Sequence, residues 1–177
     1  MKQRPTIRTE RLVLRPFVPE DAPAVYRLAG EREIALNTAT IPHPYTEEMA
    51  VKFIATHQDD YDANKSLTLA IDDGELVGTI GLAFTPDEDR AEIGYWIGVP
   101  YWGRGYASEA GRAVVRYGFE ELGLNRIYAE VFSRNPASAR VLQKIGMRHE
   151  GTHRAHIVKW GEAVDVEMYG VVRGEWI

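Results

Sequence analysis

The pattern of apolar and polar positions divides the chain into short strands and helices. Runs in which apolar residues alternate or cluster predict strands near 12–17, 66–71, 75–84, 92–99, 126–132, 147–158 and 163–172. Apolar residues that recur at steps of three and four predict helices near 20–29, 46–62, 107–122 and 137–144. The order is strand, two helices, three antiparallel strands, helix, strand, helix and two strands. It predicts a mixed α/β domain with about seven strands and about four helices.

The stretch 91–110 contains the most informative of these patterns. Aromatic, β-branched and glycine residues from Glu92 to Val99 suit a half-buried strand that ends at Pro100. Gly103 and Gly105 follow, and both tolerate a positive φ and a close approach of a ligand to the backbone. A helix must open within this loop, so its unpaired N–H groups and positive dipole end favour phosphate binding there.

Three other interpretations of this loop differ in how well they fit its residues. The glycines are compatible with an ordinary turn between a strand and a helix. A Walker A loop requires Gly-Lys, and no lysine in the chain follows a glycine, which excludes that motif. A dinucleotide-binding fingerprint requires a glycine-like residue at Ser108 and usually lies in the first βα unit of a chain, so it stays a secondary alternative.

Length and composition narrow the class of protein. The 177 residues suit a single domain over 1–177, and a chain of this length buries enough surface to need no disulfide or metal. The absence of cysteine excludes a covalent intermediate on sulfur. With 21 basic and 26 acidic residues the charge of −5 argues against a general nucleic-acid binder, and we expect no DNA partner. No apolar stretch has the length of a signal peptide or membrane span, so we expect a cytoplasmic protein without membrane contact.

Several motifs together resemble those of the GNAT acyl-CoA N-acetyltransferases, and closest the branch that acetylates ribosomal-protein N-terminal alanine and serine. The resemblance covers nearly the whole chain. It rests on Thr9 to Arg15, on Trp102 to Ala107 followed by Glu109-Ala110, on Leu122 to Arg126, and on Asn135 to Ser138 followed by Gly146. The family's pyrophosphate loop usually opens with Gln or Arg, and here Trp102 stands at that position. The resemblance implies a mostly antiparallel central sheet that is splayed at its central strands, with acetyl-CoA as the donor.

The resemblance also implies which residues bind acetyl-CoA. Backbone amides of the loop would bind the pyrophosphate, the end of the central strand would pair with the pantetheine arm, and Asn135 would bond to that arm. Arg104, Arg140 and Lys144 are candidates for the 3′-phosphate or the adenine, although each is equally compatible with a solvated surface charge. The expected cofactor-binding residues are Ile97, Gly98, Val99, Trp102, Gly103, Arg104, Gly105, Tyr106, Ala107, Ser108, Asn135, Ser138, Arg140 and Lys144.

Two residues are the candidates for the chemistry. The resemblance assigns Ser138 a hydrogen bond to the departing thiolate, although Asn135 and Ser138 also suit simple helix capping. Glu92 is the best candidate for a base, because a carboxylate at the start of an apolar strand gains a raised pKa if it is buried. Its alternative is a strand-end carboxylate that faces solvent. Asp165, Glu167 and a water relay are the other candidate bases, and the hydroxyls of Tyr95 and Tyr169 are candidates to face the acyl group.

The acceptor is an amine, and its pKa determines how much help it needs. An α-amino group near ~7.8 is partly neutral at pH 7 and a lysine amine near ~10.4 is not, so a weak base suffices for the first. We favour a protein N-terminus, with polyamines, amino acids and aminoglycosides as alternatives and a non-catalytic acyl-CoA sensor as a third reading. His149, His153 and His156 fall on mixed strand faces without a cysteine, so we expect no metal. A homodimer through the closing strands is a further expectation.

Overall fold

The structure, a computed structural model, describes residues 1–85 and 87–176 and has a mixed α/β fold. Its strands are β1 (Ile7–Arg8), β2 (Val13–Arg15), β3 (Ser66–Asp72), β4 (Leu76–Thr85), β5 (Arg90–Ile97), β6 (Arg126–Phe132), β7 (Arg148–Lys159) and β8 (Glu162–Val172). Its α-helices are α1 (Ala22–Ala29), α2 (Arg32–Asn37), α3 (Glu47–Ala55), α4 (His57–Asp62), α5 (Tyr106–Glu120) and α6 (Pro136–Lys144). None of the helices in these ranges is long and apolar enough to cross a membrane.

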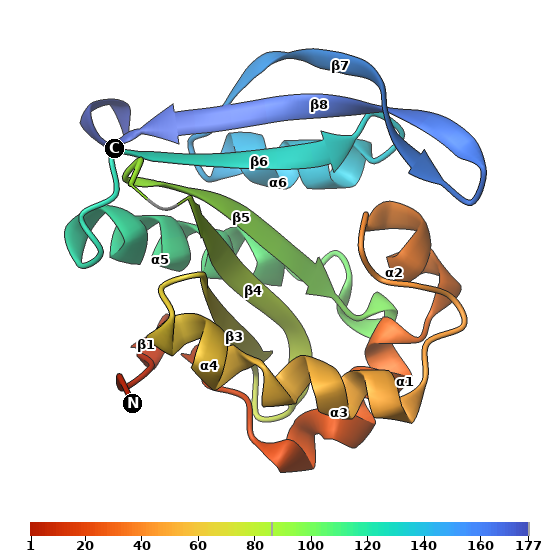
Figure 1. The fold of residues 1–177 in the computed structure, drawn as a ribbon. Coiled ribbons are helices and arrows are strands. Elements are labelled where there is room, and N and C mark those ends of the chain that lie inside the picture. The colour runs from red at the N-terminus through yellow and green to blue at the C-terminus, as the bar shows by residue number, and fades with distance from the viewer. Residues whose placement is uncertain (86, 177) are drawn as a thin grey trace.

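The strands form one sheet in the order β1-β2-β3-β4-β5-β6-β8-β7 (Figure 1). Strands β5 and β6 run parallel, and each other neighbouring pair is antiparallel. Helix α5 supplies the crossover that a parallel pair requires. The expectation of a mostly antiparallel sheet is therefore confirmed, with the one parallel junction at its centre.

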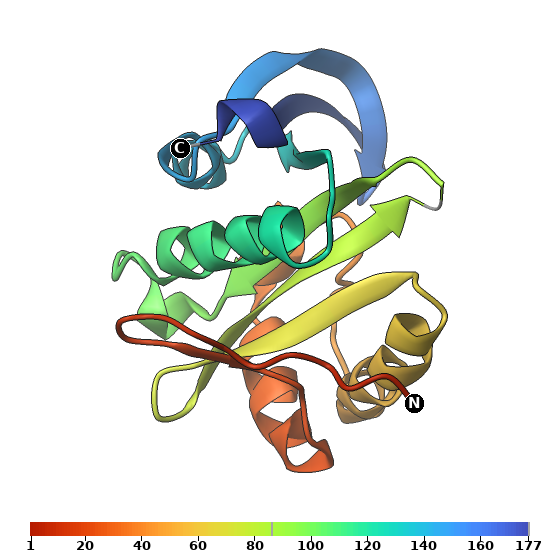
Figure 2. The same ribbon diagram turned by 90° about the vertical axis from the view of Figure 1, so that its left-hand side faces the viewer.

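Helices cover the two faces of the sheet unequally (Figure 2). On one face α5 and α6 bury Val114, Val115 and Leu142 against strands from both halves of the sheet. On the other face α1, α2 and α3 pack on the strands of the N-terminal half, with Val25, Ile54 and Trp96 in their shared core. The corresponding face of β6 and β8 carries only a smaller cluster of Phe132, Val164 and Val166. The N-terminal half is thus covered on both faces.

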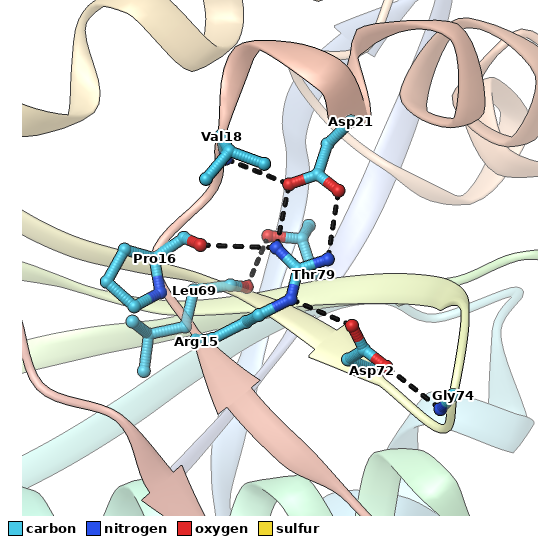
Figure 3. Close-up of polar contacts among 8 residues, drawn as sticks. All are labelled: Arg15, Pro16, Val18, Asp21, Leu69, Asp72, Gly74 and Thr79. Carbon is cyan, nitrogen blue, oxygen red and sulfur yellow. Dashed lines mark hydrogen bonds and ion pairs between the residues drawn. The ribbon is translucent and has the colours of Figure 1, made fainter.

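A partly buried ion-pair cluster joins strands β2 and β3 to the start of α1 (Figure 3). The guanidinium of Arg15 on β2 lies 2.8 Å from the carboxylate of Asp21, just before α1, and 2.8 Å from that of Asp72 at the end of β3. Burial alone would raise the pKa of Asp21, but hydrogen bonds from Arg15 and from the Val18 N–H lower it below its ordinary value. This cluster fixes α1 against the sheet edge.

The elements agree with the sequence expectations except where they are short. Strand β6 has the expected bounds, whereas the two-residue β1 and the six-residue α2 lie in segments for which no element was predicted. The single helix expected over 46–62 is divided into α3 and α4. The central strand was expected to run to Val99. It ends at Ile97 instead, because residues Val99–Tyr101 around Pro100 form a 3₁₀ turn. This turn directs the chain away from the sheet and into the glycine loop.

Candidate active site

The two parallel strands at the centre of the sheet pair only where they begin. Residues Arg90–Glu92 pair with Arg126–Tyr128, and beyond these three pairs β5 and β6 diverge, as Figure 1 shows. The Gly98 N–H donates to the Val77 carbonyl, and directions alternate along an antiparallel ladder. Tyr95 and Ile97 therefore point their backbone groups away from β4 and into the opening. The expected splay of the central strands is confirmed.

The loop at the end of β5 presents a row of free backbone amides. Gly103 and Gly105 have φ values of 77° and 80°, and α5 begins at Tyr106 without a side-chain cap. In the part of the chain that the structure describes, the N–H groups of residues 103–108 donate to no protein acceptor. Six unpaired donors at the positive end of a 15-residue helix can bind an anionic group such as a pyrophosphate. The loop therefore has the backbone geometry that the sequence predicted.

A carboxylate on the first turn of α5 braces this loop against the N-terminal segment. Glu109 accepts hydrogen bonds from the Thr9 hydroxyl at 2.6 Å, from the Arg11 N–H at 2.8 Å and from the Arg11 Nε at 2.7 Å. Arg11 also donates to the Arg104 carbonyl at 3.0 Å. Partial burial raises the pKa of Glu109, but these donors outweigh it and leave the pKa below its ordinary value. Thr9, Arg11 and Glu109 were part of the sequence motifs, but the sequence did not show that they touch.

Beside the loop lies a hollow of about 670 Å³. Its lining includes Gly105 and Ser108 and carries three basic and two acidic side chains, namely Arg11, Arg112, Lys144, Glu10 and Glu109. Of the three basic residues expected near the cofactor, only Lys144 lines this hollow. Arg140 is exposed on α6, and Arg104 packs over the Tyr101 ring and donates to the Pro100 carbonyl. Sequence analysis missed Arg112, which donates to the Lys144 carbonyl at 3.1 Å and whose only sequence signal was its place in the second turn of the helix.

The backbone groups at the end of β5 make more hydrogen bonds within the protein than the sequence suggested. Gly98 was expected to offer its backbone to a ligand, but its N–H bonds to Val77 and its carbonyl accepts the Tyr101 N–H. A Cβ on Gly98 would lie 2.8 Å from Leu28 Cδ2, so packing against α1 requires the glycine. The Val99 carbonyl accepts the Trp102 N–H, and the Ile97 carbonyl accepts the indole Nε1 of Trp102 at 2.6 Å. Trp102 thus acts here through its side chain.

Asn135 and Ser138 lie at the start of α6, across the opening from β5. The Asn135 side chain caps the helix by accepting the Ser138 N–H at 3.1 Å, so the capping interpretation of Asn135 describes its contact in this structure. The Ser138 hydroxyl is different, because it lies 2.7 Å from the hydroxyl of Tyr95 on β5. The opening therefore brings together the expected Ser138 and one of the two candidate tyrosines, whereas Tyr169 lies buried in the main core.

Glu92 is half-buried on the face of β5 opposite α5, and the exposed Glu130 lies nearby on the same face of β6. Burial raises its pKa above the ordinary value, and the nearby Glu130 carboxylate raises it further. Glu167, another candidate base, is held as a carboxylate by Ser133, Thr152 and His149, which lower its pKa to about 2. Such a group is a poor base. Asp165 accepts the Ala155 N–H at 2.7 Å and supports a bulge in β7.

The histidines do not assemble into a metal site. His149 bonds to Glu167, whereas the rings of His153 and His156 contact each other with centroids 4.9 Å apart. Among residues 1–85 and 87–176, no group of three or more His, Cys, Asp or Glu side chains is placed to hold a metal ion.

Comparisons with known proteins agree with this geometry. The model of the Acetyltransferase (GNAT) domain family matches residues 11–148. The Uncharacterized N-acetyltransferase YoaA of Bacillus subtilis is 36% identical over 173 residues, which cover 96% of this chain and 97% of YoaA. A crystal structure of a GNAT-family acetyltransferase from Bacillus anthracis has a TM-score of 0.86 at 31% identity, covering 97% of this chain and 100% of that one. RimL, a ribosomal L7/L12 α-N-protein acetyltransferase solved with coenzyme A, shares the fold with a TM-score of 0.88 at 20% identity, covering 95% and 98% of the two chains.

Proposed function

The chain belongs to the GNAT acetyltransferase family and is an acetyl-CoA-dependent N-acetyltransferase, and from that premise we propose that its acceptor is the α-amine of a protein or peptide N-terminus. In our proposal the amine attacks the thioester directly, with both substrates bound in the opening between β5 and β6. The observation that carries the placement of the cofactor is the row of six free amides at residues 103–108, directly beside that opening.

The proposed cofactor residues differ in what they offer to acetyl-CoA. Trp102 to Ser108 form the loop, and its free amides at residues 103–108 would bind the pyrophosphate. The gap-facing N–H of Ile97 and the N–H of Val99 remain for the pantetheine arm. Lys144 and Arg112 line the hollow beside the loop and would balance the charge of a further phosphate. Asn135 caps α6 and fixes Ser138 at the opening, where Ser138 would donate to the departing sulfur. Backbone N–H groups of β5 would stabilise the tetrahedral oxyanion.

Glu92 is the proposed general base. It lies where the two strands separate, and its raised pKa moves it towards the range in which a carboxylate accepts a proton at neutral pH. An α-amine near ~7.8 needs only such a modest base. This match between a single half-buried carboxylate and a partly neutral amine supports an N-terminal acceptor over a lysine or polyamine. Cytoplasmic location and dimerisation remain predictions.

The test is release of free CoA thiol from acetyl-CoA in the presence of candidate acceptors. We expect turnover on peptides that begin with Ala or Ser and none on the same peptides with a blocked N-terminus. Turnover on polyamines or aminoglycosides alone would replace the proposed acceptor with a small amine. Binding of CoA without thiol release on any acceptor would favour a sensor, and CoA binding is followed in parallel by calorimetry.

A further inference from the structure

A hydrogen bond crosses the opening between the diverging strands. The hydroxyl of Tyr95 on β5 lies 2.7 Å from Ser138 Oγ and 3.3 Å from the Ser138 carbonyl oxygen on α6. The residues of β5 and β6 on either side of it no longer pair with each other. Tyr95 is also packed against the main core, so its ring is held in place by the sheet rather than by solvent-exposed contacts. The bond thus lies where the proposed thioester would enter.

The number of protons in this pair limits what Ser138 can do. Each hydroxyl has one proton to donate. In one arrangement Ser138 donates to Tyr95, and Tyr95 donates to the Ser138 carbonyl oxygen. In the other, Tyr95 donates to Ser138 Oγ, and the proton of Ser138 is left free for a third group. Only the second arrangement lets Ser138 donate to a sulfur atom in the opening.

We propose that Tyr95 is a positioning residue for acyl transfer, which donates its hydroxyl proton to Ser138 Oγ and thereby directs the Ser138 proton at the departing sulfur of CoA. This inference rests on the proposed function of the opening. A hydroxyl that receives a hydrogen bond also becomes a stronger donor, so Tyr95 strengthens the bond from Ser138 to the sulfur as well as aiming it.

The bonds in the step balance without a net transfer from Tyr95. The amine nitrogen forms its bond to the acetyl carbon, the carbon–sulfur bond breaks, and the electron pair stays on sulfur as a thiolate that accepts the Ser138 hydrogen bond. The proton lost by the amine goes to Glu92 and then to water. Burial raises the pKa of Tyr95 to about 12. Because a thiol has a pKa of about 8.5, the phenol keeps its proton and remains a donor while the thiolate leaves.

The first test is a titration of the CoA thiol bound to the protein, followed by the ultraviolet absorbance of the thiolate. It needs no acceptor. If Ser138 donates to sulfur, bound CoA ionises more readily than free CoA. We expect the acid dissociation constant of the bound thiol to fall about 3- to 10-fold in Tyr95→Phe and about 10- to 100-fold in Ser138→Ala, from the strengths of neutral and charged hydrogen bonds. The double variant should match Ser138→Ala, because Tyr95 acts through Ser138.

Tyr117→Phe is the matched control. Tyr117 is a partly buried tyrosine on α5 whose pKa burial also raises to about 12, and it lies outside the opening. We expect it to leave the bound thiol unchanged. Calorimetry of CoA binding and the thermal unfolding midpoint show whether each variant is folded and loaded. In the transfer assay Tyr95→Phe should lower kcat by the same factor as in the titration, with the KM for acetyl-CoA nearly unchanged.

The outcomes separate the inference from the function on which it rests. A bound thiol that ionises equally in the parent and in Tyr95→Phe would overturn the role of Tyr95, even with normal acetyl transfer by the parent. Independent, multiplying effects of the two substitutions would overturn it as well. Acetyl transfer to no acceptor, with the expected titration, would contradict the proposed acceptor and support the Tyr95–Ser138 pair. A protein that does not bind CoA would overturn both.

Discussion

The two halves of the sheet differ in the helices that cover them and in the side-chain contacts that stabilise them. The N-terminal half, β1 to β5, has helices on both faces and the Arg15 ion-pair cluster at its edge (Figure 3). The C-terminal half, β6 with the β7–β8 hairpin, has α6 on one face and a small apolar cluster on the other. Most side chains of β7 are exposed. Three residue pairs between β5 and β6 join the halves within the sheet.

This difference explains where the candidate site lies. The N-terminal half contributes β5, its last strand, and the glycine loop to the site. The C-terminal half contributes Ser138 and Asn135 at the start of α6. Two cations connect the halves on the side of Glu92. Lys159 donates to the Ile41 carbonyl at 2.8 Å and Arg134 donates to the Leu36 carbonyl at 3.1 Å. The candidate reacting groups therefore lie at the junction of the two halves, which share one core beneath α5 and α6.

The largest effect is expected from replacing Glu92, the proposed base at this junction. Glu92→Gln is expected to lower kcat about 100-fold or more, the usual contribution of a general base, while CoA binding stays intact. Glu121→Gln, an exposed residue after α5, is the control. Steady-state kinetics with an N-terminal peptide measures both. Activity of Glu92→Gln within a few-fold of the parent would remove Glu92 from the mechanism and leave a water relay.

Matched glycine substitutions compare how tightly the two halves are packed. A Cβ on Gly78 of β4 would lie 2.3 Å from the Trp96 carbonyl oxygen, which belongs to the backbone and has little freedom to move. Gly78→Ala is therefore expected to cost about 2 kcal/mol of unfolding free energy. A Cβ on Gly170 of β8 would meet the Glu150 and Arg126 side chains, which can rotate away.

Gly170→Ala is accordingly expected to cost less than half as much as Gly78→Ala. Urea unfolding of both variants gives the two free energies on the same scale. Equal losses would contradict the difference in packing between the halves.

The sequence was sufficient for the elements and insufficient for their contacts. The bounds of β6 and the start of α5 after Gly105 follow from local signals, namely apolar runs and glycine positions. Helix α2 was missed because six residues of mixed polarity show no helical period. Long-range pairs such as Tyr95 with Ser138, or Glu109 with Thr9, depend on packing between distant elements. A single sequence does not show which residues far apart along the chain come into contact.

The hydrogen bonds of Glu109 with Thr9 and Arg11, called the brace of the glycine loop, are expected to link the stability of the protein to cofactor binding. Glu109→Gln removes the charged acceptor of Thr9 and Arg11 and is expected to cost about 1 kcal/mol and weaken CoA binding several-fold. Glu120→Gln, exposed on the same helix, is the control. Calorimetry and urea unfolding measure the two effects. Unchanged CoA affinity would show that the loop keeps its shape without the brace.

The same brace has a defined pH dependence. The pKa of Glu109 is lower in the folded protein than its ordinary value of 4.5. Its stabilisation is therefore complete above that ordinary value and is lost as pH falls through the lowered folded pKa. The parent and Glu109→Gln are expected to differ in stability at neutral pH and to converge in acid. A constant difference across this range would contradict the ionised brace.

The smallest expected effect concerns the carboxylates of Glu92 on β5 and Glu130 on β6, which lie near each other at the junction. Glu130→Gln removes a like charge near Glu92, so the pKa of Glu92 falls towards its ordinary value. The base then stays ionised to lower pH, and the acidic limb of kcat/KM should move to lower pH by a fraction of a pH unit. A pH–rate profile of the two proteins measures this shift. Movement in the opposite direction would contradict the coupling between the halves.

The position of the Trp102 indole has a consequence for the fluorescence of the protein. It is 48% exposed at the mouth of the glycine loop, and its ring nitrogen is tied to the Ile97 carbonyl at the end of the central strand. A ligand that orders the loop changes the polarity around this ring, and indole emission is sensitive to polarity. The protein therefore carries its own fluorescent reporter at the cofactor entrance, which allows binding to be titrated without a label.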